Sequence, residues 1–276
     1  MKNKKTLLIL TLIALACIVL LCVSLIIVVV LYRRNQDFIQ VPPIDNVSNG
    51  NQNPVSSPIE TPIKNPNIRS YKIVDKKETE ATTAYSIDNT IPQISGLSNK
   101  VTQDDFNQYV GDAVLRSDRE VKFTDPNLES GKNTLELKYD IEYATDDFVS
   151  IMISGYQYSG GAHGFTVFIP INYDLKNNTR IELQDLFKTG ADYLTKLSDY
   201  CIPRLKTKLG ADADQKWIED GAAAKAENYQ LFTFSESGLK ITFGDYQVAA
   251  YAVGPQNVTI PWSQLTTILN TKFANL

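Results

Sequence analysis

The first hydrophobic pattern in the chain is an apolar run at residues 7–31 that contains no charged side chain. As a helix, these 25 residues would extend about 37 Å, more than the roughly 30 Å hydrocarbon core of a bilayer. The pattern predicts a transmembrane helix over residues 6–32. Three lysines precede the run and two arginines follow it, which favours residues 1–5 as a cytoplasmic stub. We therefore expect a single-pass protein of the cell membrane with its C-terminal domain outside the cytoplasm.

Residues 33–67 differ in composition from the rest of the chain. They hold six of the 12 prolines, set among Asn, Ser and Gln. Such a segment does not bury a core and acts as a semi-extended spacer. We expect a linker here, followed by an ectodomain in two parts, residues 68–155 and 156–276.

Beyond the linker, alternation with period two predicts strands, and apolar positions at helical spacing predict helices. The clearest alternation is at residues 135–143, where Leu, Tyr and Ile alternate with charged residues. Pro203 is expected to kink or divide the longest helix. Hairpin-like turns join most strands and the helices are inserted between them, so we expect an α+β fold with a mainly antiparallel sheet. The expected strands are residues 71–75, 81–87, 135–143, 149–153, 165–173, 231–234, 239–243 and 258–260, and the expected helices are residues 102–116, residues 193–209 and a short one from residue 261.

The charge distribution excludes one class of partner. When the five Lys and Arg residues that flank the apolar run are set aside, 22 basic residues remain against 31 acidic ones, a balance of −9. A nucleic-acid-binding protein needs a basic surface, so we expect no nucleic-acid partner. A cationic partner is easier to accommodate.

Side chains suited to catalysis or metal binding are few. His163 is the one His of the chain, and Cys201 is the one Cys outside the apolar run. A zinc site needs three or four ligands, usually with several His or Cys among them, so we expect no metal and no cofactor. Cys201 falls on an apolar helical stripe, which indicates a buried small side chain. The pattern G-x-S-x-G of a nucleophile elbow is missing, and we assign no catalytic residue.

A glycine-rich loop at residues 159–164 joins two expected strands and contains His163. Glycine at such a junction permits positive φ or close approach of another backbone, which is the structural interpretation of Gly160 and Gly161. Alternatively, Ser159, the two glycines and His163 contact a ligand. A catalytic His163 is the third possibility and would need a serine nucleophile with an acid to orient the imidazole.

A second unusual segment, residues 246–255, holds Tyr246 and Tyr251 ahead of a Gly-Pro turn. Tyrosines in such a segment usually pack their rings in a core and bond their hydroxyls at its rim. The functional alternative is a platform that stacks on a sugar or contacts a protein. We include both tyrosines among the candidate binding residues.

These segments carry a resemblance to a known family. The strings YQYSGGAHG at residues 156–164, LQDLF at residues 183–187 and YQVAAYAVGP at residues 246–255 resemble the extracytoplasmic domain shared by RsiV-type anti-sigma factors and PdaC-type peptidoglycan deacetylases of bacteria. The resemblance covers roughly residues 68–272. It implies an exported α+β domain in two parts, which in RsiV-type members binds lysozyme and in PdaC-type members accompanies a separate deacetylase domain.

The sequence departs from both types. The five residues before the expected transmembrane helix are too few to hold a sigma factor, and a deacetylase metal site with two histidines cannot form from one. We therefore expect a membrane-anchored binding or sensing module of the envelope without catalysis of its own. Its ligand would be a cationic, lysozyme-like protein or peptidoglycan. The competing hypothesis is a peptidoglycan hydrolase that uses His163 or a pair of acids.

Overall fold

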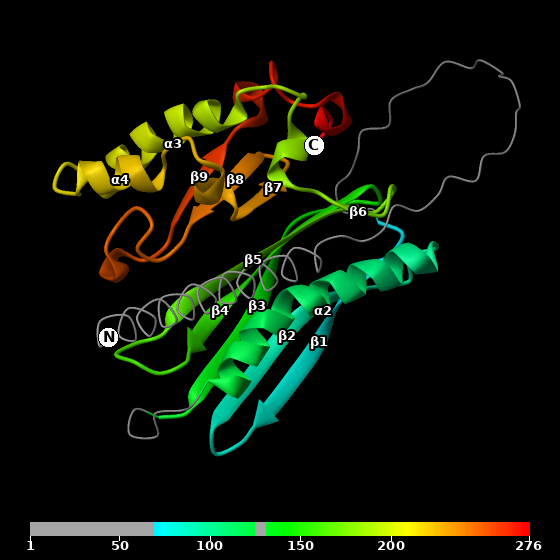
Figure 1. Cartoon of the computed structure of the whole chain (residues 1–276). Coiled ribbons are helices and arrows are strands. Elements are labelled where there is room, and N and C mark those ends of the chain that lie inside the picture. The colour runs from blue at the N-terminus through cyan, green and yellow to red at the C-terminus, as the bar shows by residue number, and fades with distance from the viewer. Residues whose placement is uncertain (1–68, 125–130) are drawn as a thin grey trace, which may run out of the picture. The chain divides into compact units, whose positions relative to one another are not determined.

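A computed structural model describes residues 69–124 and 131–276 of the chain (Figure 1). The expected stub, transmembrane helix and linker lie outside these residues. No helix in the described part is both long enough and apolar enough to cross a membrane.

The first layer is a six-stranded sheet with strands in chain order (Figure 1). All neighbours pair antiparallel except β2 and β3, which are parallel. Parallel neighbours need a crossover connection, and the long helix α2 (Lys100–Phe123) provides it. The strands are β1 (Lys72–Ala81), β2 (Tyr85–Ser95), β3 (Asn133–Ala144), β4 (Phe148–Tyr158), β5 (Phe165–Asp174) and β6 (Thr179–Arg180).

Helix α2 covers one face of this sheet and closes the first hydrophobic core (Figure 1). The helix is longer at both ends than the predicted residues 102–116. It begins after the N-cap Asn99, whose side chain accepts from Thr102 N, so the helix begins before the expected residue 102. It continues to Phe123 because Ser117 and Val121 extend its buried stripe beyond a run of charged residues.

The strand expected at residues 81–87 was also wrong, because it includes a turn. Thr82 Oγ1 accepts from the backbone N–H groups of Ala84 and Tyr85, at 3.1 and 3.0 Å. This hydroxyl stabilises the reversal between β1 and β2. Thr82 and Thr83, whose β-branched side chains are typical of strands, therefore lie in the turn.

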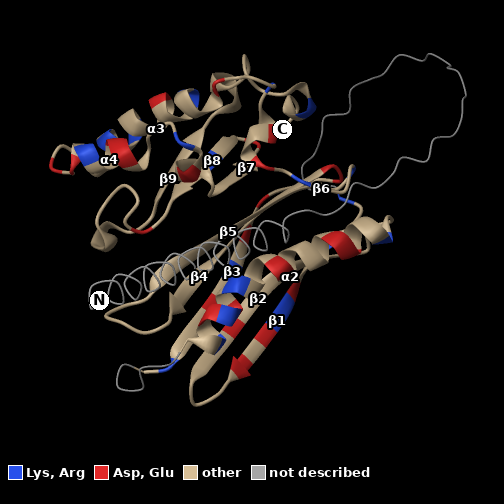
Figure 2. Ribbon diagram, viewed as in Figure 1, with Lys and Arg blue, Asp and Glu red and all other residues tan. Residues whose placement is uncertain are grey.

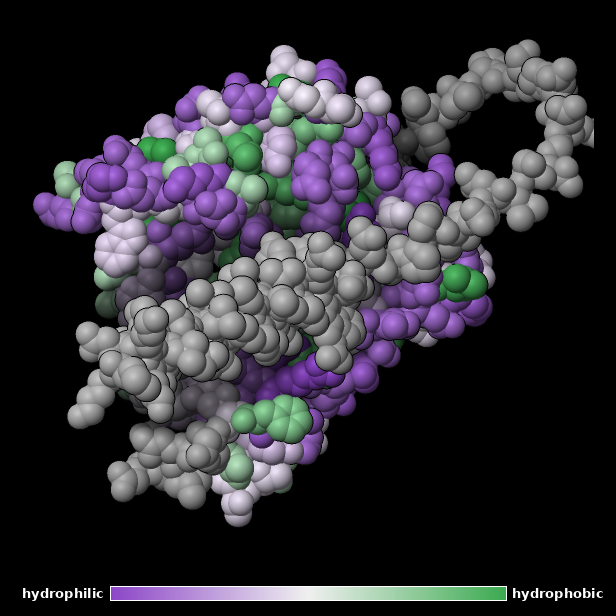
Figure 3. Space-filling view, viewed as in Figure 1, coloured by the Kyte–Doolittle hydropathy of each residue, from purple (hydrophilic) through white to green (hydrophobic). Residues whose placement is uncertain are grey.

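The second layer is a three-stranded antiparallel sheet with two helices. On the face seen in Figure 3, hydrophilic side chains gather over α4 at the left of the view. Pro203 does not divide α3, which is one helix from Tyr193 to Leu209. The short helix expected from residue 261 consists of 3₁₀ turns instead. The elements are η1 (Leu183–Leu186), α3 (Tyr193–Leu209), α4 (Gln215–Gly221), η2 (Ala226–Tyr229), β7 (Phe232–Ser235), β8 (Gly238–Phe243), η3 (Tyr251–Val253), β9 (Gln256–Ile260), η4 (Trp262–Gln264) and η5 (Thr271–Phe273).

Two buried polar side chains join the sheets. Ser150 Oγ on β4 donates to Asn172 Oδ1 on β5 at 2.6 Å and accepts from Phe234 N on β7 at 2.9 Å. Asn172 Nδ2 donates to Phe232 O at 2.9 Å. The edge of β7 therefore meets side chains of the larger sheet, which satisfies backbone groups that would otherwise be buried without a partner.

The expected fold class is confirmed, since the described part is α+β with mostly antiparallel sheets. Its division into two parts stays a prediction. The boundary expected at residues 155 and 156 falls within β4, whereas most of the first core precedes Leu175 and most of the second follows Ile181.

Candidate functional site

The loop between β4 and β5 contains the glycine pair. Gly160 and Gly161 have φ of 95° and 90°, a region that L side chains rarely adopt. Tyr158 Oη donates to Gly161 O at 2.9 Å, and Gln157 Nε2 donates to Ser159 Oγ at 3.3 Å. Both glycines therefore adopt the positive φ that the structural interpretation expects.

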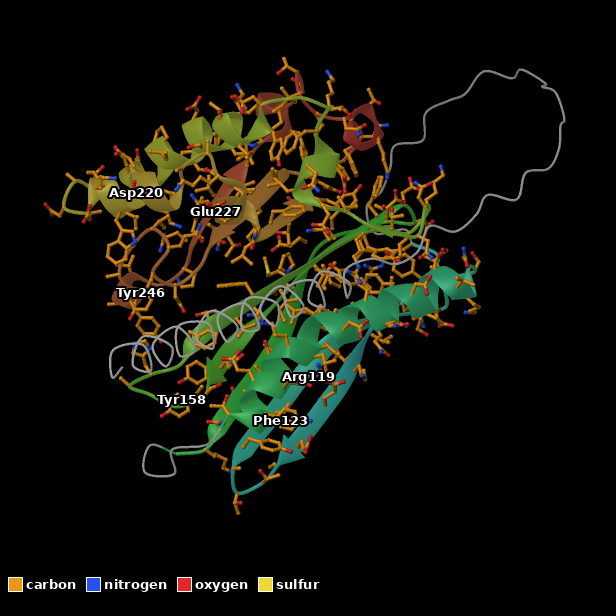
Figure 4. The ribbon with its side chains drawn as sticks, in the orientation of Figure 1. Arg119, Phe123, Tyr158, Asp220, Glu227 and Tyr246 are labelled. Carbon is orange, nitrogen blue, oxygen red and sulfur yellow. The ribbon has the colours of Figure 1, made fainter. Side chains whose placement is uncertain are left out.

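Three rings stack beside this loop. One of them, Tyr246, is distant from the loop in sequence, and its hydroxyl lies near the His163 ring (Figure 4). The ring centroids of His163 and Tyr251 lie 4.1 Å apart, with planes inclined by 24°. Those of Tyr246 and Tyr251 lie 5.5 Å apart, and those of His163 and Tyr246 6.4 Å apart. The fold thus brings together two segments that the sequence singled out separately.

Close packing explains why position 164 holds a third glycine. Its N–H donates to Tyr156 Oη at 3.1 Å, and its carbonyl accepts from Tyr251 Oη at 3.0 Å. His163 Nδ1 lies 2.8 Å from the same carbonyl oxygen. A Cβ at this position would lie 2.3 Å from Gln157 O, so no larger residue fits without movement.

The backbone at Tyr246 adopts φ of 62°, which is rare for a bulky residue. Trp217 Nε1 on α4 donates to Tyr246 O at 2.9 Å. The neighbouring Asp245 Oδ2 accepts from Thr166 N on β5 at 2.7 Å. Strain of this kind persists only where the surroundings hold it, and here two elements do so.

The rings lie at the surface of the protein. Tyr246 is 51% exposed and Tyr156 43%. We name this set the aromatic surface: His163, Tyr246, Tyr251 and Tyr156. Exposed aromatic side chains in a contiguous group are typical of sites that bind proteins or ligands.

Two acids lie beside the aromatic surface. Asp88 on β2 is in register with Glu136 on β3, and Glu136 is in register with Tyr156 on β4. Directly paired residues share one face of a sheet, so the three side chains form a row. Asp88 and Glu136 are exposed and form no ion pair with another described residue. Acidic residues also lie on α4 (Figure 2).

The surroundings of His163 bear on acid–base chemistry. Its two ring nitrogens lie near Gly164 O and Tyr246 Oη, at 2.8 and 3.3 Å. No described carboxylate contacts the ring, and Ser159 Oγ bonds to Gln157 instead. The described residues also contain no group of three or more side chains that could hold a metal ion. Burial raises the pKa of the Cys201 thiol to about 12, as the buried position predicted for it implies.

Of the predicted binding residues, the structure brings His163, Tyr246 and Tyr251 into contact. Ser159, Gly160 and Gly161 shape the loop that carries the imidazole. Tyr156 was not predicted as a member of the group. It stands near the end of β4 next to the loop, and that position was the one signal that could have identified it.

Two family models match the chain. Residues 78–166 match the model described as Deacetylase PdaC, and residues 184–263 match the model described as a protein of unknown function, DUF3298. The first segment contains His163 and the second contains Tyr246 and Tyr251. The aromatic surface is therefore built from both matched segments.

Two curated relatives come from Bacillus subtilis strain 168. The peptidoglycan-N-acetylmuramic acid deacetylase PdaC is 35% identical over 160 residues, which are 58% of this chain and 34% of the relative. The anti-sigma-V factor RsiV is 27% identical over 191 residues, which are 67% of this chain and 65% of the relative. The chain spans less than two thirds of either relative. The predicted resemblance is confirmed, since the chain contains the domain that the two relatives share.

Solved structures show the same fold. A crystal structure of a DUF3298 family member from Bacteroides fragilis has a TM-score of 0.53 at 17% identity, over 75% of this chain and 96% of that one. A DUF3298 family protein from Pseudomonas aeruginosa PAO1 gives 0.53 at 16% identity over the same shares. Both likenesses concern the fold alone.

Proposed function

We propose that the chain is a membrane-anchored, extracytoplasmic binding module of the bacterial envelope and that the aromatic surface is its binding site. The observation that supports this most directly is the exposed stack of His163, Tyr246 and Tyr251. Its backbone is held by hydrogen bonds to α4 and β5, so little order has to be gained on binding. Both relatives belong to the envelope, which agrees with this role.

The partner we favour is a cationic protein of the lysozyme kind. The balance of −9 after the apolar run and the unpaired row of Asp88 and Glu136 both attract a basic surface. Charges outside the contact raise the association rate, and the desolvated rings supply most of the affinity. Peptidoglycan is the alternative ligand, because tyrosine rings also stack on sugars.

Surface plasmon resonance with the full-length chain in detergent micelles and hen lysozyme tests the site. We expect Tyr246→Ala and Tyr251→Ala to weaken binding about tenfold or more, because they remove the central rings. Phe123→Ala is the matched control, since Phe123 is 81% exposed at the end of α2 (Figure 4). Equal loss in the control and the two tyrosine variants would refute the proposed site.

The same measurement tests the acidic row. Asp88→Asn with Glu136→Gln should slow association at low salt and change dissociation little. Asp104→Asn on α2 removes an exposed acid elsewhere and should have no such effect. If lysozyme fails to bind at low salt while purified peptidoglycan sediments the protein, the glycan is the ligand.

The hydrolase hypothesis draws no support from the neighbours of His163. A general base must lie within reach of the nucleophile whose proton it accepts, and a second group must orient the base. Among the described residues, the imidazole contacts a backbone carbonyl and a tyrosine hydroxyl. We therefore propose binding rather than hydrolysis as the role of this surface.

A further inference from the structure

The end of β5 opposite the glycine-rich loop carries a groove with a volume of about 630 Å³. Its walls come from β6, from the segment between η1 and α3, and from the C-terminal turn η5. The volume lies within the roughly 300–1,000 Å³ typical of small-molecule sites. The side chains that matter for its chemistry are Arg180, Gln184, Lys188, Thr189, Tyr193 and Lys272.

Three cations line this far-end groove in an otherwise acidic protein. The Arg180 guanidinium lies 4.1 Å from the centroid of the Tyr109 ring and has no carboxylate partner among the described residues. Lys188 Nζ donates to the backbone carbonyl of Thr267 at 2.8 Å, also without a described carboxylate. These two side chains therefore form no ion pair with another described residue and can bond to a ligand.

The third cation is held in place from beneath. Lys272 Nζ pairs with Asp174 Oδ2 at 2.5 Å, and the Asp174 side chain is fully buried. The acid on the groove wall is Asp185, whose Oδ2 accepts from Glu182 N at 2.8 Å. Asp174 and Asp185 offset two of the three cations, so the groove keeps a positive balance.

Neutral polar groups separate these charges. Gln184, Thr189 and the Tyr193 hydroxyl line the groove and form no side-chain hydrogen bond with another described residue. The Tyr193 ring stacks on Phe187, with centroids 4.7 Å apart and planes inclined by 7°, which fixes its orientation. Separate cations among unpaired amide and hydroxyl groups suit a ligand with acidic groups spaced by hydroxyls.

We propose that the far-end groove binds an acidic saccharide, with Arg180 and Lys188 facing its carboxylates or phosphates. Guanidinium and ammonium groups form charge-assisted hydrogen bonds to both kinds of oxyanion. Gln184, Thr189 and Tyr193 then bond to sugar hydroxyls. β5 spans ten residues between the two sites, so at about 3.3 Å per residue this site is separate from the aromatic surface.

Isothermal titration calorimetry on the full-length chain in detergent micelles tests this site with three probes at low salt. Trigalacturonic acid carries carboxylates, phosphorylated maltotriose carries phosphate, and maltotriose is neutral. We expect at least one acidic probe to bind more tightly than maltotriose by about tenfold or more. The acidic probe that binds identifies the source of the negative charge. Equal binding of all three, or no binding of either acidic probe, overturns the proposal.

Variants locate the site. Arg180→Gln with Lys188→Gln should raise Kd for the acidic probe about tenfold or more. The matched control removes two exposed lysines of α3 outside the groove, Lys196→Gln with Lys208→Gln, and should leave Kd nearly unchanged. If both pairs weaken binding equally, only net charge matters and the site is refuted.

Failure of this proposal is distinguishable from failure of the aromatic surface. Tyr246→Ala should retain the acidic probe with unchanged affinity. Thermal melts of the Arg180→Gln and Lys188→Gln pair show whether it is folded, and Gln184→Ala gives a milder second variant. Gln184→Ala should weaken the saccharide probes, and it should leave inorganic phosphate unaffected.

Discussion

Strand β5 ends very differently at its two termini. At Phe165 it meets a loop with two glycines at positive φ and a stack of exposed rings. At Asp174 it ends in a fully buried carboxylate that accepts from Asn177 N at 2.8 Å and pairs with Lys272 of η5. One end presents apolar rings to solvent, and the other uses a buried charge to fasten the C-terminal segment.

The two ends of β5 contribute differently to binding and to stability. An exposed ring contributes little to folding, because it loses little contact with water. A buried carboxylate is costly unless it is fully paired, so its partners become essential to the fold. We therefore expect substitutions at the loop end to change binding more than folding, and substitutions at Asp174 to do the reverse.

The largest expected effect is at Asp174. Asp174→Asn removes the charge that pairs with Lys272 and one acceptor of the Asn177 side chain. We expect the free energy of unfolding to fall by about 2–3 kcal/mol, measured by urea denaturation. Asp104→Asn, at an exposed site on α2, should cost less than about 0.5 kcal/mol. Equal costs would remove the contrast between the two ends.

The contribution of Asp174 should depend on pH. Burial acts to raise the pKa of Asp174, but hydrogen bonds from Asn177 and Lys272 outweigh it and lower the pKa below its ordinary value. A lowered pKa gives stability that is present above the unfolded value of about 3.9 and is lost as the pH falls through the folded pKa. The stability gap between the native chain and Asp174→Asn should therefore narrow from pH 7 to pH 3. A constant gap would contradict this account.

A smaller effect is expected at the loop end. Gly161→Val forces a β-branched residue into φ of 90°, and nothing lies within 4 Å of the added Cβ, so the cost is conformational. We expect a loss of about 1–2 kcal/mol, read from thermal melts. Ala162→Val is the matched control, since its φ is not positive. A Gly161→Val variant as stable as this control would refute the conformational requirement.

The smallest effect concerns the strained tyrosine. Because Tyr246 has φ of 62°, Tyr246→Gly should be more stable than Tyr246→Ala by about 1 kcal/mol. At Tyr251, where φ is not positive, the order should reverse, with Tyr251→Ala more stable by about 0.5 kcal/mol. Chemical denaturation of the four variants measures both differences. The same order at both positions would show that backbone conformation does not distinguish them.

Local patterns predicted several elements well. The alternation at residues 135–143 corresponds to β3, because a strand with one buried face repeats every two residues whatever lies around it. The apolar stripe at residues 193–209 corresponds to α3 for the same reason with a different period. The ends of elements were less predictable. The position of the turn at Thr82 and the continuation of α2 past Arg116 depend on the contacts that the turn and the last helical turn make.

The candidate site was predicted in pieces. Gly160 and Gly161 mark a positive-φ loop from composition alone, because few other residues tolerate that conformation. The grouping of His163 with Tyr246 could not be predicted, because the two residues are 83 positions apart in sequence. Tyr156 stayed hidden because its role depends on the position of Gly164 across the hairpin.

By itself, the sequence determined the periods of strands and helices, the places where glycine is required and the acidic balance of the chain. These properties depend on the shape and charge of each residue and its nearest neighbours. Only the tertiary structure decided that His163 stacks on Tyr251, that Asp174 is buried against Lys272, and that Arg180 and Lys188 share a groove. Such contacts join distant segments, and the packing of two sheets through Ser150 and Asn172 sets which segments meet.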